Sequence, residues 1–195
     1  MPEILRQINW VDISIFVIIC RVIFIAQEKG LAVESFKLLG TILATYLSLH
    51  YFVQLANFLR GNVILGSIPE HLFYFPSLLL LSTIGYLFFA FLRKLLIKFL
   101  KLEEAPGLNK WGGVILGALR SLLLSGLIIF ILVFSSSAYL EKSIRNSYSA
   151  NFFYRVPSAV YSAIWNGLLC KLISNESFNN MVLDFGIQKK KEEKK

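Results

Sequence analysis

Charged residues are scarce in this 195-residue sequence. Asp, Glu, Lys and Arg make up 16% of the chain, hydrophobic residues make up 56%, and the mean hydropathy is +0.64. Soluble domains carry about 25% charged residues, and a domain of this size has too much surface to cover with so few. The composition therefore excludes an ordinary water-soluble enzyme and a disordered chain. It indicates one compact unit that is integral to a membrane.

Residues that commonly carry chemistry are also few. The two cysteines, Cys20 and Cys170, lie far apart and fit no metal or redox spacing, so they act as small apolar side chains. The two histidines, His50 and His71, have no metal-ligand spacing, and we expect His50 to be an interfacial side chain. No G-x-S-x-G, H-E-x-x-H or P-loop lysine motif is present. We therefore expect no catalytic residues, no cofactor and no metal, and a protein that is not an enzyme.

Long apolar runs are what the sequence has instead. A helix needs about 20 apolar residues to cross the ~30 Å hydrocarbon core, and runs that do not alternate exclude a β-barrel. A tight hairpin at Glu28-Lys29-Gly30 would join the first two runs. The sequence predicts an all-α membrane four-helix bundle in residues 1–135, with spans at about 10–27, 34–56, 74–95 and 111–134.

Residues 136–195 form a more polar C-terminal region. Within it, Val160, Ile164 and Leu168 recur at i, i+4 and i+8, and Tyr161 and Trp165 accompany them. This spacing predicts an amphipathic helix at about 156–173 that lies in the membrane interface, with a fifth span as the alternative. The chain ends in a Lys-rich tail at 189–195, which holds five Lys and two Glu.

Basic residues are unevenly divided between the two sides of the predicted membrane. One side holds the first and third loops, with Lys29, Lys37, Arg93, Lys94, Lys98, Lys101 and Lys110. The other side holds Arg6, Arg60, Lys142 and Arg145. The positive-inside rule therefore places the basic loops in the cytoplasm and both termini outside, although the Lys-rich tail favours the opposite orientation. The basic excess predicts contact with anionic lipids and no nucleic-acid partner.

Polar residues inside the second predicted span lie on one side of its helix. At 100° per residue, Glu34, Thr41, Thr45 and Ser48 fall within an arc of about 60°. A single polar face on an apolar helix points into the bundle, because polar groups in lipid are costly. The stripe predicts interhelical hydrogen bonding or, alternatively, the lining of a narrow polar path.

Two charged residues of the first predicted span have structural explanations. Asp12 follows Asn9 by three residues just before an apolar run, which predicts capping of the helix start, with a proton or ion site as the alternative. Arg21 lies inside the span. The tight hairpin allows Arg21 to pair with Glu28 or Glu34, and it could instead extend to the interface.

The fourth predicted span carries small residues at a regular spacing. Gly113, Gly117, Ser121 and Ser125 recur every four residues, and Arg120 lies on the same side of the helix. A G-x-x-x-G pair allows another helix to approach closely. The pattern predicts helix packing, within the bundle or between subunits, rather than an activity.

Several short motifs in a fixed order resemble one protein family. They are Asn-Trp-Val-Asp at 9–12, the Lys29-Gly30 turn, Glu34, Leu-Leu-Gly at 38–40, Leu-Asn-Lys at 108–110, Gly112-Gly113 and Leu-Gly-Ala-Leu-Arg at 116–120. Their order and spacing resemble the colicin V production protein family of bacterial inner-membrane proteins. The resemblance covers roughly residues 8–135.

This resemblance implies a multi-pass protein of the bacterial inner membrane that is associated with toxin (bacteriocin) production or export. It transfers no catalytic residues. The expected partners are the lipid bilayer, a second copy of the chain, or other membrane proteins. The alternative function is a small oligomeric channel or transporter that uses the polar face of the second span.

Overall fold

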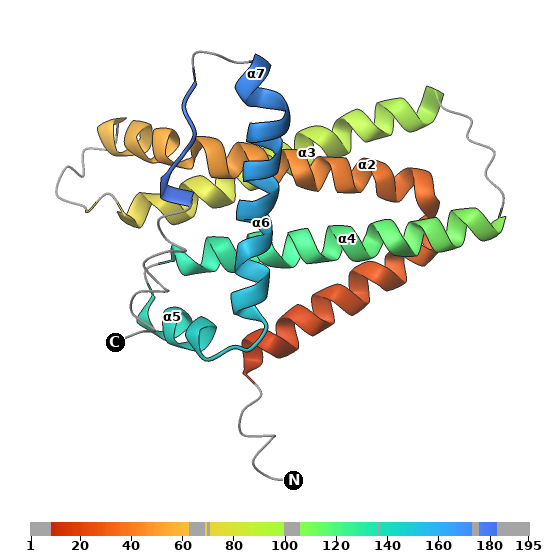
Figure 1. Cartoon of the computed structure of the whole chain (residues 1–195), viewed down its shortest axis with the longest axis horizontal. Coiled ribbons are helices and arrows are strands. Elements are labelled where there is room, and N and C mark those ends of the chain that lie inside the picture. Colours follow the sequence, from red (N-terminus) through yellow and green to blue (C-terminus); the bar gives the residue numbers. More distant parts are fainter. Residues whose placement is uncertain are drawn as a thin grey trace, which may run out of the picture.

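The computed structural model describes residues 9–62, 69, 71–99, 106–135, 137–172 and 176–182. In chain order the elements are α2 (Trp10–Asn62), α3 (His71–Phe99), α4 (Pro106–Val133), α5 (Ala138–Arg145), α6 (Ala150–Ile164), η1 (Trp165–Leu169) and α7 (Cys170–Leu172) (Figure 1). These described ranges contain no strand, so the all-α class is confirmed. The Lys-rich tail at 189–195, together with Arg6 and Lys101, lies outside them.

Three of the described helices are long and apolar enough to cross a membrane. They span Trp10–Gly61, His71–Leu95 and Asn109–Val133. The predicted count of four differs because the first two predicted spans belong to one helix, α2, which bends at Gly30. Figure 1 shows the two arms of α2 as a V with its tip at this bend. The expected hairpin is therefore a bend within one helix, with no loop between its arms.

Gly30 can form the bend because it has no side chain. Its φ of 79° and ψ of 173° interrupt the helix, and side-chain-bearing residues rarely adopt such a positive φ. The Asn109 side chain of α4 lies where a Cβ on Gly30 would be. Its Oδ1 accepts the freed backbone N–H of Leu31 at 2.5 Å. The first turn of α4 therefore caps the second arm of α2.

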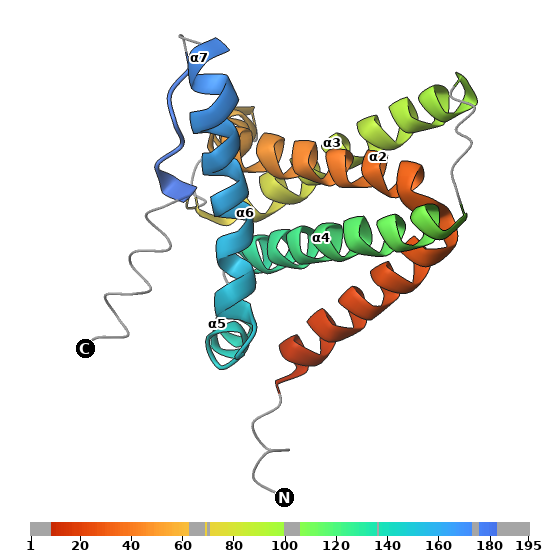
Figure 2. The ribbon, with the colours of Figure 1, turned by 45° about the vertical axis from the view of Figure 1, so that its right-hand side comes forward.

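Helix α6 crosses the long helices steeply and lies over α4 and the second arm of α2 (Figures 1 and 2). The crossing on α4 is close at Gly126, where a Cβ would lie 2.5 Å from the Phe153 carbonyl oxygen and 2.8 Å from Pro157 Cδ. A glycine is therefore required where the two helix backbones meet.

The buried face of this helical segment contains the two aromatic residues that accompany the predicted stripe, and not the aliphatic stripe itself. Tyr161 and, in η1, Trp165 are buried, whereas Leu168 is 62% exposed and Val160 and Ile164 are only partly buried. The predicted stripe is one position away from the packed face, because large aromatic rings rather than aliphatic side chains fill the gap over the bundle. The helical segment also begins earlier than predicted, at residue 150.

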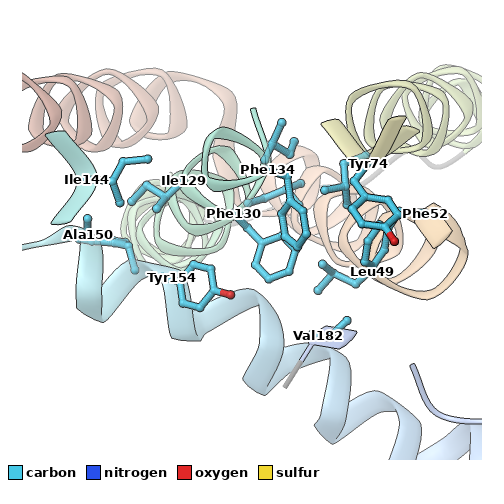
Figure 3. Packing of buried hydrophobic residues seen from close by; sticks show 14 of the residues in the cluster. Leu49, Phe52, Tyr74, Ile129, Phe130, Phe134, Ile144, Ala150, Tyr154 and Val182 are labelled. Atoms are coloured by element: carbon cyan, nitrogen blue, oxygen red, sulfur yellow. The ribbon is translucent and has the colours of Figure 1, made fainter. Parts of the chain in front are cut away.

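The core lies where the second arm of α2, α3, α4 and α6 meet (Figure 3). Phe52 contacts Tyr74 and Phe134 edge to face, with ring centroids 5.5 Å apart in both pairs. Phe130 stacks on Tyr154 at 5.2 Å. Such pairs add to the free energy gained by burying their apolar area. The core therefore joins the C-terminal segment to the apolar helices.

The outer surface of the long helices is apolar as well. Large side chains such as Phe16, Phe24, Phe88, Phe91 and Ile115 are more than half exposed. Soluble monomers rarely expose contiguous apolar area on this scale, whereas hydrocarbon tails cover it at no cost. The apolar helices and this surface indicate a membrane protein.

Candidate functional site

A buried ion-pair network joins the second arm of α2 to α4. The Glu34 carboxylate is 0% exposed, and its Oε2 lies 3.1 Å from Nη2 of Arg120, whose side chain is 8% exposed. Lys37, one helical turn after Glu34, donates to the other carboxylate oxygen. One carboxylate thus holds two cations, and the buried charges neutralise one another.

Arg21 lies apart from this network. The two Glu34 oxygens contact Lys37 and Arg120. Arg21 therefore does not form the predicted pair with Glu34. The physical reason is the face that the first arm turns toward α4. Val22 and Ala26 are buried on that face, while Arg21 is exposed beside it.

The polar stripe of the second arm is buried and bonded to its own helix. Thr41, Thr45 and Ser48 are at most 1% exposed. Their hydroxyls donate to the carbonyl oxygens of Lys37, Thr41 and Thr45 at 2.9, 2.8 and 3.1 Å. These bonds lie within one helix, so the hydroxyls are satisfied without the interhelical bonds that the pattern predicted.

The small-residue face of α4 packs on the first arm of α2. A Cβ at Gly113 would lie 2.7 Å from the Ala26 carbonyl oxygen, and a Cβ at Gly117 would overlap the Ala26 side chain. Ser121 and Ser125 continue this buried face. The glycine pattern predicted helix packing either within the bundle or between subunits, and in the structure this face, which we call the glycine seam, packs within the chain.

Asp12 lies in the first turn of α2, where Asn9 Oδ1 accepts the Val11 backbone N–H at 3.4 Å as the capping pattern predicts. The Asp12 carboxylate also holds the start of α6. Its Oδ1 accepts the Ser147 hydroxyl at 2.7 Å and the Ser149 backbone N–H at 3.0 Å, and it also accepts the Ser149 hydroxyl. Ser149 directly precedes α6, so the carboxylate lies at the positive end of that helix. We call these contacts the Asp12 tether.

The residues next to Asp12 hold α5. The Asn9 side-chain amide donates to the Ser143 carbonyl oxygen, and the Trp10 ring stacks on Tyr139 with centroids 6.5 Å apart and an interplanar angle of 5°. The Asn-Trp-Val-Asp motif is therefore a docking site for α5 and the start of α6. Sequence reasoning missed Ser147 and Ser149, because no local pattern connects residues more than 130 positions apart.

His50 is the centre of a second tether, at the other end of α6. It is 4% exposed, so its ring is covered by other side chains. Its Nδ1 lies 2.9 Å from the Tyr161 hydroxyl, and its Nε2 lies 2.9 Å from Glu176 Oε2. Tyr51 donates to the other Glu176 oxygen at 3.0 Å, and the Tyr161 oxygen accepts the Asn179 backbone N–H at 3.0 Å. We call these contacts the His50 tether.

Tyr161 is the neutral partner in the His50 tether. Burial raises the pKa of the Tyr161 hydroxyl above its ordinary value, so the phenol keeps its proton. The two ring nitrogens of His50 contact different segments, Nδ1 the Tyr161 hydroxyl and Nε2 the Glu176 carboxylate. His50 therefore connects α6 to the segment 176–182.

The two tethers and the ion-pair network each connect segments that are far apart in the sequence. In the part of the chain that the structure describes, no three His, Cys, Asp or Glu side chains come together as a metal-ligand group. What the arrangement does is fix helices relative to one another. Asp12 and His50 hold the two ends of α6, while Glu34 and Arg120 hold α2 on α4.

Comparison with curated proteins and with solved structures gives no match to this chain. The colicin V production protein family matches residues 11–157. The match continues past residue 135, where the motif resemblance ends, and it includes both Asp12 and its partners Ser147 and Ser149. Since the match covers well over half of the sequence, the chain belongs to the colicin V production protein family.

Proposed function

We propose that this protein is a non-enzymatic, multi-pass component of the bacterial inner membrane that supports the production or export of a toxin such as a bacteriocin. Membership of the colicin V production protein family supports a role in toxin production. The apolar helices support the membrane location. The role is that of a scaffold, which holds a fixed arrangement of helices for other components.

The observation that carries this proposal is that the polar stripe of the second arm of α2 is bonded within the bundle. Glu34 is neutralised by Lys37 and Arg120, and Thr41, Thr45 and Ser48 bond to their own helix. A transport path needs polar groups that face water or a passing substrate. Groups already committed to one another support a structural role instead.

In this proposal the two arms of α2 cross the membrane separately, which gives four crossings with α3 and α4. Each arm contains at least the 20 or so residues that a crossing needs. The Gly30 bend, the end of α3 and the start of α4 lie at one end of the bundle (Figure 1). The positive-inside rule places that end in the cytoplasm.

Assembly with partners would use a surface other than the glycine seam. Gly113 and Gly117 are already covered by Ala26 of the same chain. A homo-oligomer, or a complex with other membrane proteins, would therefore form through the exposed apolar faces of the long helices. Crosslinking in native membranes followed by identification of the crosslinked proteins would find these partners.

The experiment that tests the proposed role compares toxin inside and outside cells. A colicin V-producing strain that lacks its own copy of this family member is complemented with this protein, with Arg120→Met, or with the control Arg21→Met. We expect secreted toxin to fall without the protein and to return with the wild type and the control, but not with Arg120→Met. Equal secretion with and without the protein would exclude the proposed role.

The alternative function, an oligomeric channel or transporter, has one observation in its favour. Several buried polar atoms of the described long helices have no hydrogen-bond partner, among them Arg120 Nε, Ser125 Oγ and Ser77 Oγ, and a buried charge is a functional candidate by default. Ion flux in proteoliposomes that falls on Glu34→Ala would support this function. Proteoliposomes that show no flux above empty vesicles would support the scaffold.

A further inference from the structure

A small open pocket lies between the second arm of α2 and the C-terminal part of α3. Two cations line it, Lys37 from α2 and Arg93 from α3, together with the rings of Phe36, Tyr86 and Phe89. The helices meet closely behind it, since a Cβ at Gly40 would lie 3.1 Å from the Phe89 side chain. The pocket thus combines positive charge with an aromatic wall.

Among the residues that the structure describes, the cations around this pocket outnumber the carboxylates. Lys37, Arg93 and Arg120 lie near one described carboxylate, Glu34, which already pairs with Lys37 and Arg120. Arg93 and Arg120 both lie close enough to repel the Lys37 ammonium. Within the described ranges, no carboxylate lies within ion-pair distance of Arg93. An excess of positive charge beside apolar surface is costly unless an anion compensates for it.

In the proposed arrangement of four crossings, on which this step rests, the pocket lies at the depth where a bilayer supplies such an anion. Lys37 is seven residues from the Gly30 bend, about 10 Å along the helix, and Arg93 lies near the end of α3. The bend of α2 and the C-terminal end of α3 lie at the same end of the bundle (Figures 1 and 2). Lys94 and Lys110 are exposed at that end too. The cations are therefore near the headgroup level rather than at the bilayer centre.

We propose that this pocket binds the phosphate of an anionic phospholipid. The planar guanidinium of Arg93 matches the geometry of phosphate oxygens, and Lys37 adds a second positive charge. Phe36, Tyr86 and Phe89 form the wall along which the first part of the acyl chains lies. Basic pockets between membrane helices are a known way of binding anionic headgroups. The bound lipid would supply the negative charge that the cluster lacks.

Lipid binding to the purified full-length chain tests this site. The probes are phosphatidylglycerol and phosphatidylcholine with identical acyl chains, measured by native mass spectrometry from detergent, with inorganic phosphate as a competitor. We expect phosphatidylglycerol to bind at least tenfold more tightly than phosphatidylcholine. Arg93→Gln should weaken phosphatidylglycerol binding about tenfold, the effect of losing one charge-assisted hydrogen bond.

Lys94→Gln is the matched control, because it removes the same charge from the neighbouring, exposed position. It should change binding less than twofold, and both variants should keep the wild-type helical content by circular dichroism. Equal losses in the two variants, or equal affinity for the two lipids, would overturn the site. Displacement of the lipid by millimolar phosphate would show a free-anion site instead. The inference does not depend on the role in toxin production, because this assay contains no toxin.

Discussion

At the scale of single residues, the polar side chains of this protein act mainly as connectors between distant segments. Glu34 and Arg120 connect α2 with α4, and Asp12 connects the first turn of α2 with the start of α6. Each of these contacts pairs a charged or polar group inside the protein, so that the group does not face lipid unpaired. Removing one partner therefore costs more than the pair itself contributes, because the other partner stays buried and unpaired.

The first prediction concerns the Glu34–Arg120 pair. Arg120→Met leaves the Glu34 carboxylate buried with Lys37 alone, and we expect a loss of about 3–5 kcal/mol of stability. Arg21→Met, at an exposed position, should change stability by about 0.5 kcal/mol or less. Thermal unfolding in detergent measures both. The double variant Arg120→Met with Glu34→Gln should recover part of the loss, and identical melting of the two single variants would contradict the pairing.

The second prediction concerns the Asp12 tether. Asp12→Ala removes the acceptor of three hydrogen bonds at the start of α6, with an expected cost of about 1–3 kcal/mol. Hydrogen exchange should speed up in α5 and α6 and stay unchanged in α4, because the loss is local. Asp12→Asn keeps one carbonyl acceptor and should have a smaller effect. Uniform acceleration across all helices would argue against a tether.

At the scale of helices, the apolar runs predicted the long elements well, because a run of about 20 apolar residues suits one structure in a membrane. The Gly30 turn also followed from its residue type. Which side of α6 packs on the bundle could not be predicted from its residue types. Val160 and Tyr161 are neighbours in sequence, and only the shape of the surface beneath the helix decides which of them is buried.

The candidate site was predicted less completely than the helices. Glu34 and Arg120 were both singled out as residues inside spans, but their pairing was not, because one sequence does not show which faces of two helices meet. The partners of Asp12 and His50 lie more than 100 positions away. Contacts at that separation come from the tertiary fold and leave no local pattern.

The third prediction concerns the packing of α4 on the first arm of α2. Gly117→Leu places a side chain where Ala26 already lies, and we expect a loss of about 1–3 kcal/mol or more from overpacking. Gly107→Leu is the control, because a Cβ there has open space. Thermal unfolding of the purified variants compares them. If Gly117→Leu changes only crosslinking between copies and not the melting temperature, the seam is an intersubunit one.

At the scale of the whole molecule, the protein has apolar residues both in its core and on its outer surface. Most of the apolar window of α3 is exposed, with 17% of it buried, whereas 56% of the α4 window is buried. Helix α4 is therefore the centre of the bundle and α3 lies at its edge. This arrangement fits a small membrane protein whose solvent is lipid.

The fourth prediction concerns orientation. If four crossings place the Gly30 end in the cytoplasm, the C-terminus lies outside. Alkaline phosphatase fused after residue 195 should then be active, and green fluorescent protein fused there should be dark. The reverse pair of results would place both termini in the cytoplasm, which is the orientation that the Lys-rich tail favours.

The two tethers also set the order in which the protein can be completed during synthesis. Asp12 and His50 belong to α2, while their partners Ser149 and Glu176 are made much later. Glu176 follows His50 by 126 residues, a delay on the order of 10 s at ordinary translation rates. During that time the C-terminal partners of these two residues do not yet exist, so α6 can dock only after α2, α3 and α4 have been synthesised. Truncated or stalled chains would lack those partners, and the tethers thereby distinguish a finished molecule from an unfinished one.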